Sequence, residues 1–218
     1  MSGEAQAAGV FRGLRRYLRP RAGSASEEHC ELCGAAIGER HHHLLQLDAR
    51  KIVCGCEACA ILFSDAVAGG YRRIPTEIRA LGDFAMDDAQ WEELSIPINM
   101  AFFCRAEHAA EPAVFYPSPG GATQANLGSD AWRQIVEQNP ALEKMASDVE
   151  ALLVNRLSQP HEYFIVPIDE CYRLIGLIRT QWRGFSGGKE VWDSISGFFA
   201  SIRNRAARAG APQGATHA

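Results

Sequence analysis

The chain of 218 residues has 22 Lys and Arg against 26 Asp and Glu, which gives a formal net charge of −4 at pH 7. This balance excludes the broad basic surface that binding to duplex nucleic acid needs, so we expect no nucleic-acid partner. Hydrophobic residues make up 47% of the chain and aromatic residues 9%, which predicts one medium globular domain with room for a small added module.

The sequence carries no signal for export or for membrane insertion. No apolar run approaches the roughly 20 residues that a membrane span requires. The small, polar N-terminus lacks the apolar stretch of a secretory signal peptide, and the twin arginine Arg15-Arg16 precedes a charged segment. The seven cysteines are odd in number and clustered, unlike the spread pairs of a disulfide framework. We therefore expect a cytoplasmic protein with reduced thiols.

Residues 1–28 are predicted to form a flexible leader with a short basic amphipathic stretch over residues 10–21. In that stretch apolar residues line one side and arginines surround them. We expect a solvated leader that is helical part of the time, because chain ends are usually poorly ordered. The alternative is weak contact with a membrane surface or with an acidic partner.

Five of the seven cysteines fall within residues 30–59, as Cys30-Glu-Leu-Cys33 and Cys54-Gly-Cys56-Glu-Ala-Cys59. Two C-x-x-C pairs with 22 residues between Cys33 and Cys56 resemble the spacing of a four-cysteine zinc site. Spacing favours Cys30, Cys33, Cys56 and Cys59 as ligands, with Cys54 as a spare or an alternative ligand. Zinc is preferred because it is the commoner ion in such sites, and a single iron is the alternative.

Residues 29–64 are predicted to form a zinc-ribbon-like module. Residues 42–47 and 51–53 are expected to be strands of a hairpin between two cysteine knuckles. So small a module has little apolar surface, so a metal would supply much of its stability. Neither C-x-x-C motif is predicted to follow a strand and open a long helix, which disfavours a redox disulfide. His41, His42 and His43 lie beside the site, where at most two converge along a strand, and we expect them to be solvated rather than to bind metal.

Residues 70–204 are predicted to form an α+β body, followed by an Ala-, Gly- and Pro-rich tail over 205–218 that we expect to be disordered. The predicted strands are 97–103, 113–116 and 162–166. Helices are predicted to begin at Asp87, Ser129 and Asn139. Two further helices are predicted over 168–182 and 191–202. The helix at Asn139 is based on Leu142, Met145, Val149 and Leu152, which recur at three- and four-residue steps. The fold class is therefore α+β, with a metal module ahead of a mixed body.

No constellation of catalytic residues is evident, and we expect a binding protein rather than an enzyme. Cys104 and His108 are spaced as a nucleophile and base but lack an orienting third group. The segment Tyr116 to Thr123 lacks the lysine of a phosphate-binding loop, so it is interpreted as a turn. Trp182 and Arg183 precede a glycine-rich break, which predicts either an exposed surface for a partner or a packed helix–helix corner.

From Cys30 to about Ile202 the chain resembles an uncharacterised bacterial family, a domain of unknown function, whose members are encoded within [NiFe]-hydrogenase gene clusters, notably those of actinobacterial-type, oxygen-tolerant uptake enzymes. The matching residues are Cys30-Glu-Leu-Cys33-Gly34, Leu44-Leu45, Cys54-Gly-Cys56-Glu-Ala-Cys59, Ile96-Pro97, Tyr116-Pro-Ser-Pro119 with Gly121-Ala-Thr123, and Trp182-Arg-Gly-Phe-Ser-Gly-Gly188. The resemblance implies an accessory or maturation protein that contacts a hydrogenase subunit or a maturation factor. A rubredoxin-like electron carrier with one iron is the alternative.

Overall fold

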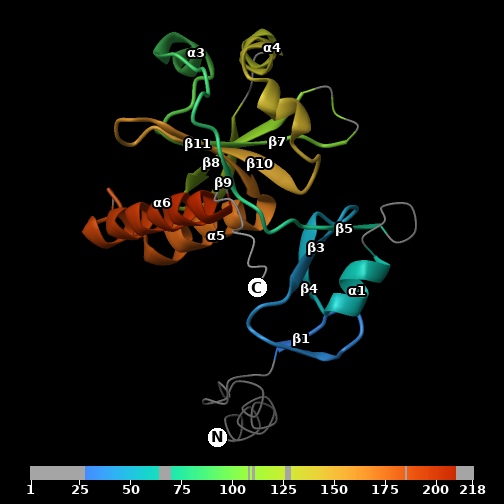
Figure 1. Ribbon diagram of the computed structural model, residues 1–218. Coiled ribbons are helices and arrows are strands. Elements are labelled where there is room, and N and C mark those ends of the chain that lie inside the picture. The colour runs from blue at the N-terminus through green and yellow to red at the C-terminus, as the bar shows by residue number, and fades with distance from the viewer. Residues whose placement is uncertain are drawn as a thin grey trace, which may run out of the picture.

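The computed structural model describes residues 28–63, 70–107, 109, 111–125, 129–184 and 186–209. The predicted amphipathic stretch over 10–21 lies outside these residues, as does the end of the predicted tail from residue 210. Figure 1 shows a small module built from the N-terminal part of the described chain beside a larger body of sheet and helices. Within the described residues, no helix is both long and apolar enough to cross a membrane.

An antiparallel sheet of six strands forms the centre of the body. In spatial order the strands are β6 (Arg79–Ala80), β11 (Glu162–Pro167), β10 (Glu150–Asn155), β7 (Met100–Cys104), β8 (Ala113–Ser118) and β9 (Gly121–Ala125). Helices cover both faces of this sheet (Figure 1). One face carries α5 (Ile168–Gln181) and α6 (Lys189–Ala209), and the other carries α3 (Asp88–Glu93), α4 (Ser129–Gln138) and the 3₁₀ helix η2 (Pro140–Lys144).

The two-sided covering explains why the interiors of the central strands are apolar on both of their faces. Successive side chains of a strand point to opposite faces. In β7, Phe102 and Cys104 therefore pack in the cluster under α5 and α6, whereas Ala101 and Phe103 pack in the cluster under α3 and α4. The ring of Phe103 stacks on Trp132 of α4 at 5.3 Å between centroids. Each face of the sheet thus has its own apolar core.

The predicted helix from Asn139 through Leu152 was wrong. The structure has only η2 at its start, followed by strand β10 at the centre of the sheet. Residues 151–154 are completely buried, because both faces of β10 are covered. A strand buried on both faces is an unbroken apolar run without period-2 alternation, so Met145, Val149 and Leu152 matched a helical stripe by coincidence.

Other predicted elements of the body are confirmed. Asp87 caps α3 through a capping box with Gln90, in which the Gln90 N–H lies 2.7 Å from the Asp87 carboxylate. The strand over 162–166 is β11, and the stripe over 168–182 is α5. The final helix extends to Ala209, past the predicted start of the tail at residue 205. This boundary differs because Ala206 is buried in the core and Arg205 pairs with Glu170.

In its described residues, the N-terminal module has two small antiparallel sheets and one short helix. The elements are β1 (Glu28–His29) with β2 (Ala36–Ile37), then β3 (His42–Gln46), β4 (Lys51–Gly55) and β5 (Tyr71–Arg73) in the order β4-β3-β5, and α1 (Glu57–Leu62). The β3–β4 hairpin confirms the predicted one, and β5 was not predicted. Among the described residues, the separate apolar cluster of the module has Leu44, Val53 and Ala60 as its buried members.

Buried charges and apolar contacts join the module to the body. The carboxylate of Asp148, only 7% exposed, accepts hydrogen bonds from Arg50 at 2.6 Å and from Arg72 at 3.2 Å. Leu45 of β3 packs in the same apolar cluster as the body strands and α5. Because both kinds of contact cross the boundary, the module is held against the sheet rather than tethered by a free linker.

Leu152→Ala should lower the free energy of unfolding by about 2–5 kcal/mol, because it opens a cavity in a strand that has no exposed face. Leu157→Ala is the matched control, since Leu157 is 38% exposed and its truncation should cost under about 1 kcal/mol. Urea unfolding followed by circular dichroism measures both. Equal losses in the two variants would contradict the central position of β10.

Candidate metal centre

Four cysteine sulfurs gather in the N-terminal module. The Sγ atoms of Cys30, Cys33, Cys56 and Cys59 all lie within 4.8 Å of one another, and those of Cys33 and Cys56 are 3.7 Å apart. In a tetrahedral zinc site with Zn–S bonds of about 2.3 Å, neighbouring sulfurs are about 3.8 Å apart. These four residues therefore have the donor type, the number and the spacing for one tetrahedral ion.

The first pair of sulfurs comes from a tight turn between β1 and β2. The Cys30 N–H donates to the Ala35 carbonyl at 2.8 Å, and the Gly34 N–H donates to the Cys30 carbonyl at 2.8 Å. Gly34 has φ of +76°, in the left-handed region that favours glycine. The turn thus brings Cys30 and Cys33 to the same side, as predicted for a knuckle.

The second pair comes from the start of a helix rather than from a second knuckle. Cys56 is the N-cap residue of α1, which follows β4, and Cys59 lies in the first turn of that helix. Residues three apart lie on one face of a helix, so both sulfurs face the first pair. This motif follows strand β4 and opens a helix of only six residues, so it does not open the long helix of a redox motif, and the Cys30–Cys33 pair completes the group.

Two of the four thiols, those of Cys30 and Cys59, have pKa values shifted in opposite directions. Burial raises the pKa of Cys30, but hydrogen bonds from the backbone N–H groups of Cys56, Cys33 and Leu32 outweigh it and lower that pKa to about 6. Burial, followed by hydrogen bonds to the other three sulfurs, raises the pKa of Cys59 to about 12. Sulfurs this close cannot all carry negative charge unless a cation offsets it. The group is thus chemically suited to a divalent ion.

Cys54 lies outside the four-sulfur group. It precedes Gly55, the last residue of β4, and faces His43 across the hairpin. A Cβ atom at Gly55 would lie 2.4 Å from Cδ1 of Leu44, which is completely buried. Glycine at position 55, between Cys54 and Cys56, therefore leaves the space that the side chain of Leu44 occupies.

The three histidines next to the cysteines lie on two opposite faces of the hairpin. His42 contacts Glu57 and Arg73 on one face of β3, whereas His41 and His43 meet on the other face with their ring centroids 5.0 Å apart. The Nδ1 atom of His43 lies 2.7 Å from the Asp169 carboxylate in the first turn of α5. This hydrogen bond raises the pKa of His43 against the opposing effect of burial.

The remaining candidates from the sequence do not form a catalytic group among the described residues. Cys104 is 8% exposed, and burial raises its pKa to about 12, while His108 lies outside the described part of the chain. The segment from Tyr116 to Thr123 is the β8–β9 hairpin, in which the Ser118 hydroxyl donates to the Gly121 carbonyl at 3.0 Å. This agrees with its interpretation as a turn.

Trp182 and Arg183 lie at the end of α5 with different exposures. Trp182 packs against the body core and meets Trp192 with 6.3 Å between ring centroids. Arg183 is exposed and donates to the carbonyls of Thr180 and Trp182. The corner therefore combines a packed indole with an accessible guanidinium, and its use as a partner surface stays a prediction.

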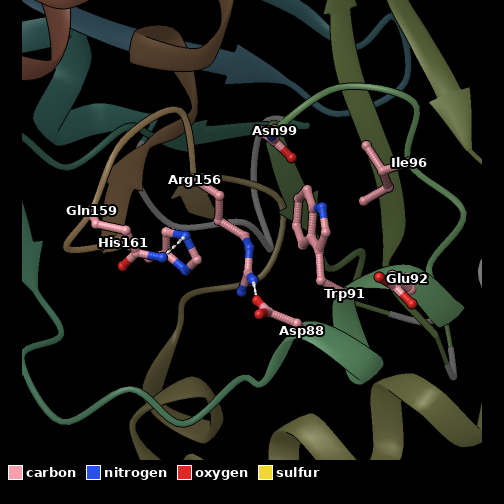
Figure 2. Close-up of a pocket in the computed structure, with 8 residues that line it drawn as sticks. All are labelled: Asp88, Trp91, Glu92, Ile96, Asn99, Arg156, Gln159 and His161. Atoms are coloured by element: carbon pink, nitrogen blue, oxygen red, sulfur yellow. Dashed lines mark hydrogen bonds and ion pairs between the residues drawn. The ribbon is translucent and has the colours of Figure 1, made fainter.

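A polar cavity of about 550 Å³ lies on the body beside α3 (Figure 2). At its centre the buried Arg156 donates to Asp88 and to the Tyr163 hydroxyl, and its guanidinium lies 5.3 Å from the centroid of the Trp91 ring. Figure 2 shows Arg156 between Trp91 and the pair Gln159–His161. The guanidinium contacts the first residue of α3, Asp88, and the ring of Trp91 in the same helix, so we assign it to the packing of that helix on the sheet.

A protein family described as "Family of unknown function (DUF5947)" matches residues 29–206. The chain belongs to this family. The match begins one residue before Cys30 and ends within α6, so it includes the four-sulfur group, the module and the body sheet. No curated protein and no solved structure matches the chain. The predicted link of this DUF5947 chain to hydrogenase gene clusters stays a prediction.

Gly55→Ala should lower the free energy of unfolding of the module by about 1–3 kcal/mol, because the added methyl group displaces the buried Leu44. Gly38→Ala is the matched control, since nothing lies within 4 Å of a Cβ atom at that position. Hydrogen exchange of the β3–β4 amides measures this loss of stability. Full protection in Gly55→Ala would show that Leu44 adapts without cost.

Proposed function

We propose that this chain is a zinc-binding accessory protein that acts through protein–protein contacts, and that its partner is a [NiFe] hydrogenase subunit or maturation factor. The observation that carries the metal part is the approach of four cysteine sulfurs within 4.8 Å. The resemblance to proteins encoded in hydrogenase gene clusters supports the partner class. The reduced thiols that the site requires suit the cytoplasm.

A structural role for the ion follows from the size of the module. Among the described residues, its separate apolar cluster has three buried members, which is too few to offset the conformational entropy of ordering about 35 residues. An ion held by four thiolates would link the turn between β1 and β2 to the start of α1, in addition to the hydrogen bonds that Glu31 of the turn makes with Cys54 and Lys51 of β4. Four protein ligands leave no open coordination position, so the ion itself would have no catalytic role.

Cys33→Ser should remove one zinc ion per chain from the purified protein, because three thiolates bind far more weakly than four. Elemental analysis measures the loss. Hydrogen exchange should show lost protection within residues 29–63, while the strands of the body keep theirs because they have their own cores. Cys54→Ser is the matched control and should keep the four-sulfur ion.

An unchanged zinc content in Cys33→Ser would refute the site. Visible absorption separates the alternative ion, because ferric iron on four thiolates is coloured and zinc is colourless. A coloured protein with iron in place of zinc would favour the rubredoxin-like electron carrier. In that case the exposed Cys33 is the ligand nearest to an electron-transfer partner.

Deleting the gene in a host that makes a [NiFe] hydrogenase should lower the activity or assembly of that enzyme and leave its messenger RNA intact. The purified chain alone should neither oxidise hydrogen nor reduce dyes, because a closed zinc site has no open position and no redox change. Native gels stained for hydrogenase activity provide the measurement. Normal maturation in the deletion strain would refute the accessory role.

The same strain tests the corner at Trp182 and Arg183. Complementation with Trp182→Ala/Arg183→Ala should restore less activity than the wild-type gene, because tryptophan and arginine are enriched among residues that dominate binding energy. Arg183→Ala alone separates the two roles of the corner, since Arg183 is exposed and only Trp182 packs on the core. Full activity with reduced thermal stability in the double variant would assign the corner to packing.

A further inference from the structure

A second group of metal-ligand atoms lies in the module beside the four cysteines. One ring nitrogen of His41, one ring nitrogen of His43 and the sulfur of Cys54 all lie within 4.8 Å of one another. The hairpin register explains the group, because it pairs His43 directly with Cys54. His41 precedes His43 by two residues and so lies on the same face.

Hydrogen bonds fix the proton on the same nitrogen of both rings. The Nδ1 atom of His41 lies 2.9 Å from the Gly38 carbonyl, and that of His43 lies 2.7 Å from the Asp169 carboxylate. A carbonyl and a carboxylate only accept, so Nδ1 carries the hydrogen and Nε2 of the neutral ring keeps a lone pair. A histidine held by a carboxylate at one nitrogen while the other faces a metal is a common feature of zinc sites.

The free nitrogen of His41 is buried without a partner. The side chain of His41 is 9% exposed, and its Nε2 atom has no hydrogen-bond partner among the described residues and almost no solvent contact. Oδ1 of Asp169 is likewise buried without a partner among them. Burying a polar atom that makes no hydrogen bond is unfavourable, so a buried atom of this kind indicates a missing ligand. A metal ion at His41 Nε2 would supply it.

Space for an ion to enter lies next to the histidines. A cavity of about 450 Å³ is lined by His41, His43 and Asp169 together with Thr76 and Arg205. It gives an ion a route from solvent and leaves room for a water molecule as a further ligand. The cavity also reaches His42, but both ring nitrogens of that residue are already engaged, by Glu57 and by Arg73.

We propose that His41, His43 and Cys54 bind a second zinc ion, with Asp169 positioning the ring of His43. Imidazole and thiolate ligands together suit zinc. Three protein ligands, unlike the four sulfurs nearby, leave a coordination position for water or a small anionic ligand. The module would then hold two ions of different character, one closed and structural and the other open toward the cavity.

The test uses the full-length reduced protein, loaded with zinc and dialysed against a chelator of moderate affinity. Wild-type protein should keep a second zinc ion per chain, and Cys54→Ser and His41→Ala should each lose that ion alone. His42→Ala is the matched control and should keep both, because its ring lies on the other face of β3. Cys33→Ser should lose both ions, because loss of the four-sulfur ion unfolds the module that holds the second site. Retention of the four-sulfur ion in Cys54→Ser therefore shows that this variant is still folded and that only the second site is lost.

X-ray absorption at the zinc edge identifies the ligands directly. Wild-type protein should show Zn–N distances of about 2.0–2.1 Å beside Zn–S distances of about 2.3 Å, and Cys54→Ser should show sulfur ligands alone. Asp169→Asn should weaken the second ion by about 10- to 100-fold without changing the first, as expected for a residue that positions a ligand. An unchanged affinity in Asp169→Asn would remove Asp169 from the proposal. One zinc ion per chain in wild-type protein, with sulfur ligands only, would overturn the second site and leave the four-sulfur site untouched.

Discussion

The register of the β3–β4 hairpin determines where each candidate metal ligand of the module lies. The pairing places Cys54 opposite His43 and Val53 opposite Leu44. A slip of one residue would exchange the two faces of a strand, moving Leu44 out of its core and His43 away from Cys54. The missing side chain at Gly55 helps to specify the register, because only glycine allows the buried Leu44 to approach so closely there.

The cysteine spacing predicted the four-sulfur group well because it depends on local geometry. In each C-x-x-C pair the two cysteines are three residues apart, and both a tight turn, as at Cys30–Cys33, and the start of a helix, as at Cys56–Cys59, bring such sulfurs to one side. The helix at Cys56 was missed because Glu57 to Leu62 is too short to show a periodic stripe. The grouping of His41 with Cys54 was beyond sequence reasoning, since it depends on which residues of the two strands are paired. The alternation of strand side chains indicated only that two of the three histidines converge.

The body shows where apolar periodicity is reliable and where it fails. Helix α5 packs on one side only, so its stripe from Ile168 to Ile178 stands out against polar neighbours. Strand β10 is covered on both sides, and its apolar run of Ala151 to Val154 has no polar alternation to identify it. The prediction of a helix there failed because burial on both faces removes the periodic signal that distinguishes strand from helix.

Helix α5 connects two parts of the molecule that the sequence separates. Its first turn holds Asp169 against His43, and its last turn leads into Trp182 and Arg183. A helix of 14 residues is about 21 Å long and resists bending. It therefore keeps the distance between His43 and the corner at Trp182 and Arg183 nearly constant. A protein seated at the corner would be held one helix length from the cavity beside His41, close enough for a flexible segment of that protein to reach in.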